Sequence, residues 1–305
     1  MTPAAAILAP AARLYRGAMT RPERWATWTP RAGDILVCTP PKCGTTWTQT
    51  ILAMLVHGGT DLPAALPVLS PWVDADLGVP AEDVQKALAA QTGRRVVKTH
   101  TPADGFPIWQ GVTVIAVYRH PLDVFFSLRN HMANRVHPAE DTPLARPLTE
   151  AFEAYIHDPS DGTDIDRDNL TNLTTHYRQT VLSGRLPDIK VFHYADMLRD
   201  GRRTVQALAR AAGIDATPHV IDQVAEATAF QAMKARAFDY VPVAGTGFWK
   251  SDADFFDSAG ARKWQSQLSE AQLAQFDTRL AALIPQPGAR AWLTDGAGTA
   301  APDGS

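Results

Sequence analysis

Residues 39–52 read TPPKCGTTWTQTIL, a short polar turn that leads directly into an apolar helical pattern. A strand, a tight glycine turn and a helix N-terminus together direct several backbone amides to one point, where the helix dipole favours negative charge. Gly44 lets the backbone approach a ligand, Thr45 and Thr46 add hydroxyl donors, and Lys42 adds a full positive charge. The stretch therefore predicts a site for a phosphate or sulfate group, although taken alone it also fits a turn that merely caps a structural helix.

Apolar, β-branched runs alternate with helical patterns along the rest of the chain. Near-continuous apolar runs are typical of parallel strands buried on both faces, and the alternation predicts an α/β sandwich around a parallel sheet. The predicted strands are residues 34–40, 94–100, 112–120 and 188–197. The predicted helices are residues 45–56, 121–132, 169–183, 201–212 and 219–227.

Two segments, residues 60–80 and 133–168, are rich in proline, glycine and polar residues and are predicted to be irregular. Long loops in α/β proteins usually cover the carboxyl edge of the sheet, where ligands bind. The chain shows no repeat and no separate linker. We therefore expect one domain over residues 1–294, followed by a disordered tail over residues 295–305.

Composition limits the classes of partner. The chain has 305 residues, of which 45% are hydrophobic and 20% charged, with a net charge of -3, so no global field attracts nucleic acid or an acidic membrane. We expect no nucleic-acid partner, no membrane span and no signal peptide. No HExxH, paired CxxC or acidic calcium loop is present, so no metal is implied. Only Cys38 and Cys43 occur, which favours the reducing cytoplasm.

The lysine of the turn stands in the wrong place for an ordinary kinase or ATPase. A Walker A loop, G-x-x-x-x-G-K-[ST], places its lysine immediately after the second glycine. Here Lys42 precedes Gly44, and the position six residues before the lysine is Leu36. The pattern therefore argues against a Walker-type nucleotide site.

Three motifs in order, PKCGTTW (41–47), KTH (98–100) and YRHPLDVFFS (118–127), resemble the cytosolic-type sulfotransferases that use 3′-phosphoadenosine 5′-phosphosulfate. The resemblance runs from about Asp34 to Phe276. It implies a single-domain α/β fold with a P-loop-like central parallel sheet flanked by helices. It also implies transfer of a sulfuryl group from this donor to the hydroxyl of a small-molecule acceptor.

The resemblance also implies a set of donor-binding residues. The loop from Lys42 to Trp47 would hold the 5′ phosphosulfate, and Arg119 with Ser127 would bind the 3′-phosphate, for which an arginine fork is suited. By itself, Arg119 would as readily form a surface ion pair with Asp123. The segments YADM (194–197) and TAF (228–230) would surround the adenine. The donor residues so implied are Lys42, Cys43, Gly44, Thr45, Thr46, Trp47, Arg119, Ser127, Tyr194, Thr228 and Phe230.

Cys43 stands where many relatives have serine. It is small enough to keep the turn, and the loop amides with the nearby lysine could depress its pKa and make it redox sensitive.

Three residues are candidates for the chemistry. His100 stands at the end of a predicted strand and has a pKa near neutrality, as a base that deprotonates an acceptor hydroxyl requires. Lys42 would neutralise the oxygen that bridges sulfur and phosphorus as that bond breaks. Lys98 would position the acceptor or the sulfate. In the family, the serine that matches Ser127 is thought to restrain the loop lysine until the acceptor arrives.

The C-terminal segment departs from the family pattern. Relatives carry Arg-Lys-Gly before a glycine and a tryptophan, whereas alignment on Trp264 places Asp257, Ser258 and Ala259 there. A carboxylate at this point would repel the 3′-phosphate. Arg262 and Lys263 a few residues later, or Lys250 earlier, would restore positive charge if the loop is shifted. No dimer signature of the animal members is present, so the oligomeric state is left open.

The acceptor is predicted only as a class. Aromatic side chains would form an apolar pocket suited to a phenol or an apolar alcohol: Phe106, Trp109, Phe152, Tyr155, Phe248 and Trp249. Each of them also fits the hydrophobic core, which we expect for most of them. Two other functions remain open: a nucleotide-dependent kinase, and a protein of the same fold that binds nucleotide without transferase activity.

Overall fold

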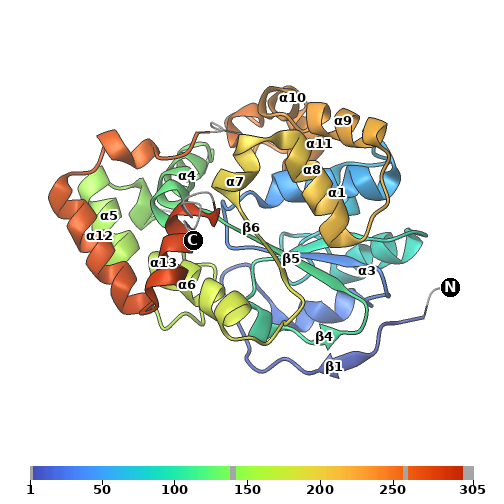
Figure 1. The fold of residues 1–305 in the computed structure, drawn as a ribbon, viewed down its shortest axis with the longest axis horizontal. Coiled ribbons are helices and arrows are strands. Elements are labelled where there is room, and N and C mark those ends of the chain that lie inside the picture. Colours follow the sequence, from blue (N-terminus) through green and yellow to red (C-terminus); the bar gives the residue numbers. More distant parts are fainter. Residues whose placement is uncertain (1–2, 138–141, 257–259, 298–305) are drawn as a thin grey trace, which may run out of the picture.

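Four parallel strands form the central sheet of the computed structural model, which describes residues 3–137, 142–256 and 260–297 (Figure 1). β2 (Ile35–Cys38) lies between β3 (Val96–Thr99) and β5 (Thr113–Tyr118), and β6 (Lys190–His193) lies outside β5. Each of the four predicted strands is present but shorter than expected. The last one, predicted to run to residue 197, ends at His193 because α7 (Tyr194–Arg199) begins at the next residue. The α/β class with a parallel sheet flanked by helices is confirmed.

Both faces of this sheet are covered, which explains the continuous apolar runs of its strands. Ile35 and Val37 of β2 join a buried cluster with α1 (Thr45–His57), whereas Leu36 and Cys38 join a cluster on the opposite face. Because successive side chains of a strand point to opposite faces, a strand buried on both sides must be apolar at every position.

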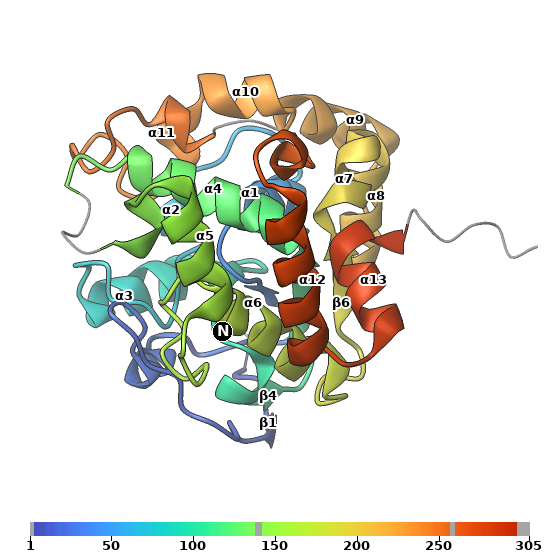
Figure 2. The same cartoon turned by 90° about the vertical axis from the view of Figure 1, so that its left-hand side faces the viewer.

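Helices cover the sheet in two groups. The first group, near the top of Figure 1, packs beside α1 and consists of α8 (Gly201–Ala212) and α9 (Pro218–Ala227). The second group consists of α4 (Pro121–Ala133), α5 (Leu148–His157), α6 (Leu170–Tyr177), α12 (Glu270–Leu283) and α13 (Pro287–Asp295). Figure 2 shows α12 and α13 running side by side next to α5 and α6.

Shorter elements complete the described chain. The remaining α-helices are α2 (Leu66–Leu69), α3 (Ala81–Ala90), α7 (Tyr194–Arg199), α10 (Phe230–Ala235) and α11 (Ala237–Tyr240). Single 3₁₀ turns occur at Pro22–Thr27, Ala103–Gly105, Pro143–Ala145, Ala253–Phe255 and Lys263–Ser266. A π-helical turn, Arg178–Leu182, continues α6 and accounts for the predicted helix end near residue 183.

The prediction that residues 133–168 are irregular is wrong in part, because α5 lies inside them. Pro147 precedes the helix, and Ala151, Phe152, Tyr155 and Ile156 form its buried face. Their spacing is helical, but the proline and glycine residues on both sides of this short segment obscured it. Residues 60–80, also predicted to be irregular, contain the single turn of α2.

A small antiparallel pair, β1 (Ile7–Ala9) with β4 (Ile108–Trp109), lies below the sheet in Figure 1. Next to it, Phe106 and Trp109 stack on each other with their ring centroids 6.1 Å apart. They also pack against Trp25 and Trp28, with ring centroids 5.1–5.9 Å apart. Both residues are therefore core residues of this region, which corrects their proposed place in an acceptor pocket.

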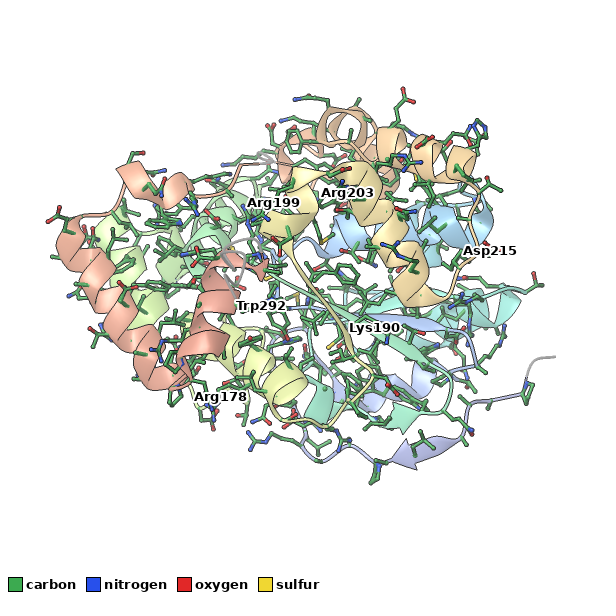
Figure 3. All side chains as sticks on the ribbon, viewed as in Figure 1. Arg178, Lys190, Arg199, Arg203, Asp215 and Trp292 are labelled. Atoms are coloured by element: carbon green, nitrogen blue, oxygen red, sulfur yellow. The ribbon has the colours of Figure 1, made fainter. Side chains whose placement is uncertain are left out.

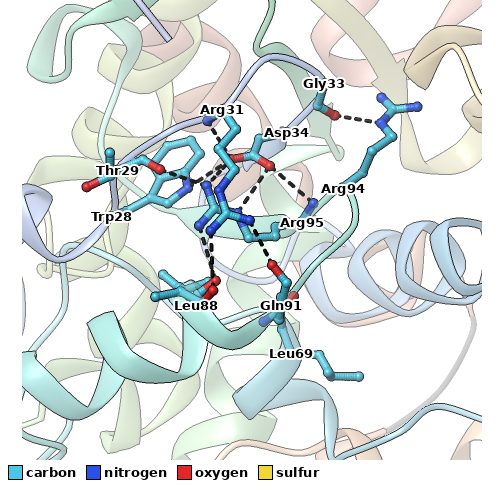
Figure 4. Close-up of polar contacts among 11 residues, drawn as sticks. Trp28, Thr29, Arg31, Gly33, Asp34, Leu69, Leu88, Gln91, Arg94 and Arg95 are labelled. Carbon is cyan, nitrogen blue, oxygen red and sulfur yellow. Dashed lines mark hydrogen bonds and ion pairs between the residues drawn. The ribbon is translucent and has the colours of Figure 1, made fainter. Parts of the chain in front are cut away.

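The amino end of β2 is held by a buried ion pair between Asp34 and Arg95 (Figure 4). Asp34 also accepts hydrogen bonds from the Trp28 indole at 3.3 Å and from the Arg31 amide at 2.9 Å. Asp34 and Arg95 are 1% and 2% exposed. The pair lies at the opposite end of the strand from the turn at residues 39–44, so it serves the fold rather than the site.

Candidate active site

The carboxyl ends of all four sheet strands carry predicted site residues. β2 runs into the loop at residues 39–44, β3 ends one residue before His100, β5 one before Arg119, and β6 one before Tyr194. The carboxyl ends of parallel strands lie at one edge of the sheet. The connection after β2 leads to β3 on one side of the sheet, and the connection after β5 leads to β6 on the other side. Such a reversal of direction is the switch point at which α/β proteins bind ligands.

The loop that leaves β2 has the geometry of an anion site. Gly44 is the N-cap of α1 with φ +99°, and a Cβ there would lie 2.8 Å from Tyr194 Cδ2. Only glycine fits this close approach in a left-handed conformation. The hydroxyls of Thr39 and Thr45 are 2.6 Å apart and brace the turn. The first turn of α1 thus faces the loop with its amides.

Lys42 has φ +62°, and its ammonium lies 4.4 Å from the centroid of the Phe255 ring. The same Nζ lies 3.2 Å from Nδ1 of His131 on α4. Burial lowers the pKa of His131 well below its ordinary value, and the nearby Lys42 charge lowers it further. A neutral imidazole therefore accepts a hydrogen bond from the lysine.

Cys43 is fully buried beneath the loop. Burial raises the pKa of its thiol to about 12, against the smaller opposite effect of Arg119. The expectation that the loop amides depress this pKa is wrong, because the side chain points into the core. A thiol held protonated and inaccessible is not a redox sensor.

Arg119, Tyr194 and Trp47 form one layered contact beside the loop. The Arg119 guanidinium carbon lies 4.7 Å from the Tyr194 ring centroid, and that ring lies 5.8 Å from the Trp47 ring. Arg119 is 5% exposed and donates to the carbonyls of Lys42 and Gly260, at 3.4 and 3.0 Å. Its Nε and the indole Nε1 of Trp47 are buried without a hydrogen-bond partner among the described residues. Two unused donors thus remain beside the loop.

A cavity of about 220 Å³ lies against Arg119 and Tyr194 and is also lined by Asp123, Arg199 and Arg262. The carboxylate of Asp123 accepts hydrogen bonds from the backbone amides of Arg262 at 2.9 Å and Lys263 at 3.2 Å. Asp123 is therefore a loop anchor, and it does not form the surface ion pair with Arg119. Arg199 projects from α7 (Figure 3) and pairs with Asp196 at 3.2 Å.

The departure from the family pattern is resolved only in part. Asp257, Ser258 and Ala259 lie outside the described residues. Arg262 reaches the cavity and lies 3.9 Å from Asp295. Lys250 does not supply charge there, because its ammonium donates to the Ala133 carbonyl at 2.7 Å, at the C-terminal end of α4.

Three other predicted donor residues are not joined to this layer by a hydrogen bond or ring contact among the described residues. Ser127 is partly buried on α4, four residues before His131. Thr228 is buried at the end of α9 and donates to the Val224 carbonyl at 2.7 Å. Phe230 begins α10 and is partly buried. Their proposed contacts with the donor stay predictions.

His100 is held in one tautomer. Its Nδ1 lies 2.6 Å from the Thr39 carbonyl, which can only accept, so Nδ1 carries the hydrogen and Nε2 has the free lone pair. Burial lowers the pKa of His100 well below its ordinary value, with a further effect of Lys98. The imidazole is therefore neutral at pH 7, the state that a general base requires.

Lys98 and His100 share an aromatic neighbour, Trp72. The Lys98 ammonium lies 5.0 Å from the Trp72 centroid, and the His100 ring lies 4.5 Å from it. Burial lowers the pKa of Lys98 to about 8, although the buried carboxylate of Asp74 acts in the opposite direction. Asp74 also accepts from the hydroxyls of Thr99 and Thr101, which flank His100, at 2.9 and 2.5 Å.

A second, smaller cavity of about 20 Å³ adjoins His100. Asp168, two residues before α6, lines it together with apolar side chains of α4 and α6. Burial raises the pKa of Asp168 to about 6. Sequence reasoning missed Asp168, Asp74 and His131, because the two acids lie in segments read as irregular and His131 is one of nine histidines.

The remaining aromatic candidates for an acceptor pocket divide into two groups. Phe152 and Tyr155 lie in the core beneath α4, where the Tyr155 hydroxyl donates to the Pro121 carbonyl at 3.0 Å, so their proposed place in the pocket is wrong. Trp249 lies 4.7 Å from the His131 ring and 5.4 Å from Phe255, on the Lys42 side of the site. Phe248 is 42% exposed beside it.

Within the described residues, no helix has the length and apolar character needed to cross a membrane. The same part of the chain holds no group of three or more histidine, cysteine or acidic residues placed to bind a metal ion.

Comparison with known proteins identifies the family. The family described as "Sulfotransferase domain" matches residues 32–286. A "Glycolipid sulfotransferase" of Mycobacterium bovis is 34% identical over 93% of this chain and 94% of that protein. "Sulfotransferase 1A1" of Mus musculus is 23% identical over 90% and 91%. Among solved structures, mouse sulfotransferase SULT7A1 complexed with PAP matches with a TM-score of 0.64 at 16% identity, over 88% of this chain and 90% of that one. The chain therefore belongs to the sulfotransferase family, and the enzyme class that its motifs predict is confirmed.

Proposed function

We propose that this protein transfers a sulfuryl group from 3′-phosphoadenosine 5′-phosphosulfate to the hydroxyl of a small-molecule acceptor by in-line displacement. The observation that carries the proposal is the convergence of Lys42, His100 and Arg119 at one edge of the sheet, each one positioned by the end of a different strand. The proposal treats residues 1–294 as one catalytic domain in the cytoplasm.

The donor-side residues suit such a ligand. The Gly44 turn and the first amides of α1 would hold the 5′ phosphosulfate, with Cys43 in the loop and Thr45 and Thr46 at the start of the helix. Arg119 would take the 3′-phosphate with its unused Nε, and Arg262 in the adjoining cavity would replace the missing basic triplet, with Lys263 beside it. Solved relatives in the same fold are complexed with PAP.

The adenine would lie beside Trp47 and Tyr194, whose rings already contact each other, with Thr228 and Phe230 at the far side. Aromatic side chains supply large, flat contact surfaces for a base. Ser127 would complete the 3′-phosphate site from α4.

The donor supplies the sulfuryl group, and the protein supplies the base and the positive charge. His100 would accept the acceptor's hydroxyl proton on Nε2, since Nδ1 is committed to the Thr39 carbonyl. Lys42 would neutralise charge that develops on the leaving oxygen, and Lys98 would hold the sulfate or the acceptor beside His100. No metal takes part in this proposal.

The acceptor is proposed only as a chemical class, not as one compound. A phenol or an apolar alcohol fits Phe248 and Trp249, and the hydroxyl of an amphiphile fits the relatives named glycolipid sulfotransferases. If no sulfuryl transfer occurred, the two alternative functions would be favoured: a kinase, or a nucleotide-binding protein of this fold without transferase activity.

Calorimetric titration with 3′-phosphoadenosine 5′-phosphate, adenosine 5′-phosphate and ATP tests the donor site. We expect the first to bind about 10- to 100-fold more tightly than adenosine 5′-phosphate, the usual effect of charge-assisted hydrogen bonds to one more phosphate. Equal affinities would contradict the proposal. The transfer step is tested with His100→Ala, for which we expect turnover to fall about 10²- to 10⁴-fold with donor affinity kept.

A further inference from the structure

Two charged residues line the cavity beside His100: Asp168, and Arg167, whose guanidinium pairs with Asp158 at 2.8 Å. Asp168 faces it from the N-terminal side of α6, whereas Val124, Leu128 and Leu173 supply apolar walls. Its volume of about 20 Å³ is close to what one water molecule needs. A ligand hydroxyl would fit between the base and the carboxylate.

Asp168 differs from Asp166 because no partner among the described residues satisfies its charge. Asp166, two residues earlier, accepts from the amides of Met19 and Thr20 and from the Thr20 hydroxyl, at 2.6, 2.7 and 2.8 Å. The Asp168 side chain forms no hydrogen bond and no ion pair with the described residues. A partly buried carboxylate without such bonds is costly, and a bound donor removes that cost.

The backbone that carries Asp168 is rigid. Asn169 caps α6 by accepting from the Asn172 amide at 2.7 Å. The Asn172 side chain in turn donates to the carbonyls of Asp164 and Arg167, both at 2.7 Å. These two amides are therefore occupied, whereas the carboxylate of Asp168 keeps its capacity to accept hydrogen bonds from a ligand.

Two cations lower the pKa of Asp168 without forming an ion pair with its carboxylate. Burial is the main effect and raises its pKa, while Arg135 and Lys42 lower it. Of these two cations, Lys42 belongs to the loop that is proposed to hold the sulfuryl group. The carboxylate therefore lies within electrostatic reach of the proposed reaction centre.

We propose that Asp168 recognises an acceptor with hydroxyl groups beside the one that is sulfated, so that the enzyme prefers a sugar head group to a simple alcohol or phenol. This inference rests on the proposed function, with His100 as the base. One hydroxyl gives its proton to His100, and a neighbouring hydroxyl donates a hydrogen bond to Asp168. A phenol has no second hydroxyl, so its binding would leave the carboxylate desolvated and unpaired.

The test measures acceptor binding in the presence of saturating 3′-phosphoadenosine 5′-phosphate, so it does not depend on turnover. Octyl β-D-glucopyranoside, 1-octanol and 4-nitrophenol are titrated separately into the wild-type protein, Asp168→Asn and Asp164→Asn. Asp164→Asn is the matched control, since Asp164 is exposed in the same segment and does not line the cavity.

We expect the wild type to bind the glucoside more tightly than octanol. Asp168→Asn should weaken glucoside binding about 10- to 100-fold, the range for hydrogen bonds to a charged group, and leave octanol and nitrophenol binding unchanged or stronger. The control should behave as wild type. Tighter binding of octanol than glucoside by the wild type, or equal losses for all three ligands in Asp168→Asn, would overturn the inference. Failure of the proposed function would be recognised by a different measurement, the donor titration, in which 3′-phosphoadenosine 5′-phosphate would then bind no more tightly than adenosine 5′-phosphate.

Discussion

Lys42 of the strand-to-helix loop donates a hydrogen bond to Nδ1 of His131, with 3.2 Å between the two nitrogens. An ammonium can only donate, so the imidazole is neutral and carries its hydrogen on Nε2. The family resemblance leads one to expect Ser127 as the residue that restrains this lysine. The observed bond goes instead to a residue one helical turn further along α4.

We predict that His131, rather than Ser127, limits donor hydrolysis when no acceptor is present. In His131→Ala the lysine is released from this bond and can reach the leaving oxygen, so acceptor-independent release of 3′-phosphoadenosine 5′-phosphate should rise several-fold. The product can be followed by chromatography. Ser127→Ala is the comparison: a rise in that variant, with none in His131→Ala, would assign the restraint to the serine.

Activity should depend on pH through the protonation states of two groups, one of which must be neutral and the other charged. His100 must be neutral, and its pKa lies well below 6.5, so its protonation reduces turnover only in acid. Lys98 must be charged, and its pKa is about 8, so turnover should fall as the pH rises through that value. The predicted profile of kcat is a plateau that ends above pH 7, followed by a decline centred near pH 8. Lys98→Arg should remove the alkaline decline, because arginine keeps its charge; an unchanged decline would exclude Lys98 as its cause.

Arg262 should supply affinity for the 3′-phosphate. Replacing it with alanine removes a cation from the cavity beside Arg119, and we expect binding of 3′-phosphoadenosine 5′-phosphate to weaken about 10-fold or more. Binding of adenosine 5′-phosphate, which lacks that group, should change little. Lys250→Ala serves as the control, since its ammonium is bound to the Ala133 carbonyl. An equal loss for both nucleotides would show that Arg262 shapes the loop without binding the phosphate.

The Asp34–Arg95 pair should contribute to stability without contributing to the site. Asp34→Ala leaves a buried guanidinium without its carboxylate, and such changes usually cost about 3–5 kcal/mol of unfolding free energy. Urea unfolding measures the loss. Surface pairs offer a contrast: Arg203→Ala, which breaks an exposed pair with Asp200, should cost less than about 1 kcal/mol. If the folded Asp34→Ala protein also lost donor affinity, the pair would have a role at the site.

The sequence was sufficient for the architecture and for the position of the strand-to-helix loop at residues 39–44. Strands buried on both faces must be apolar at every position, so β2, β3, β5 and β6 could be recognised from composition alone. The order of a strand, Gly44 and a helix start predicts an anion site because the geometry is local. His100 and Arg119 follow because the residue after a parallel strand always lies at the carboxyl edge.

Contacts between distant segments were decided only by the tertiary structure. Local pattern could not show that His131 meets Lys42, that Asp123 anchors the loop of Arg262, or that Asp168 and His100 line one cavity, since each pair is separated by dozens of residues. Whether an aromatic residue lines a pocket or fills the core likewise depends on what covers it. Phe106 and Phe152 became core residues, and Cys43 an inert thiol, because the packing of other segments removed them from solvent.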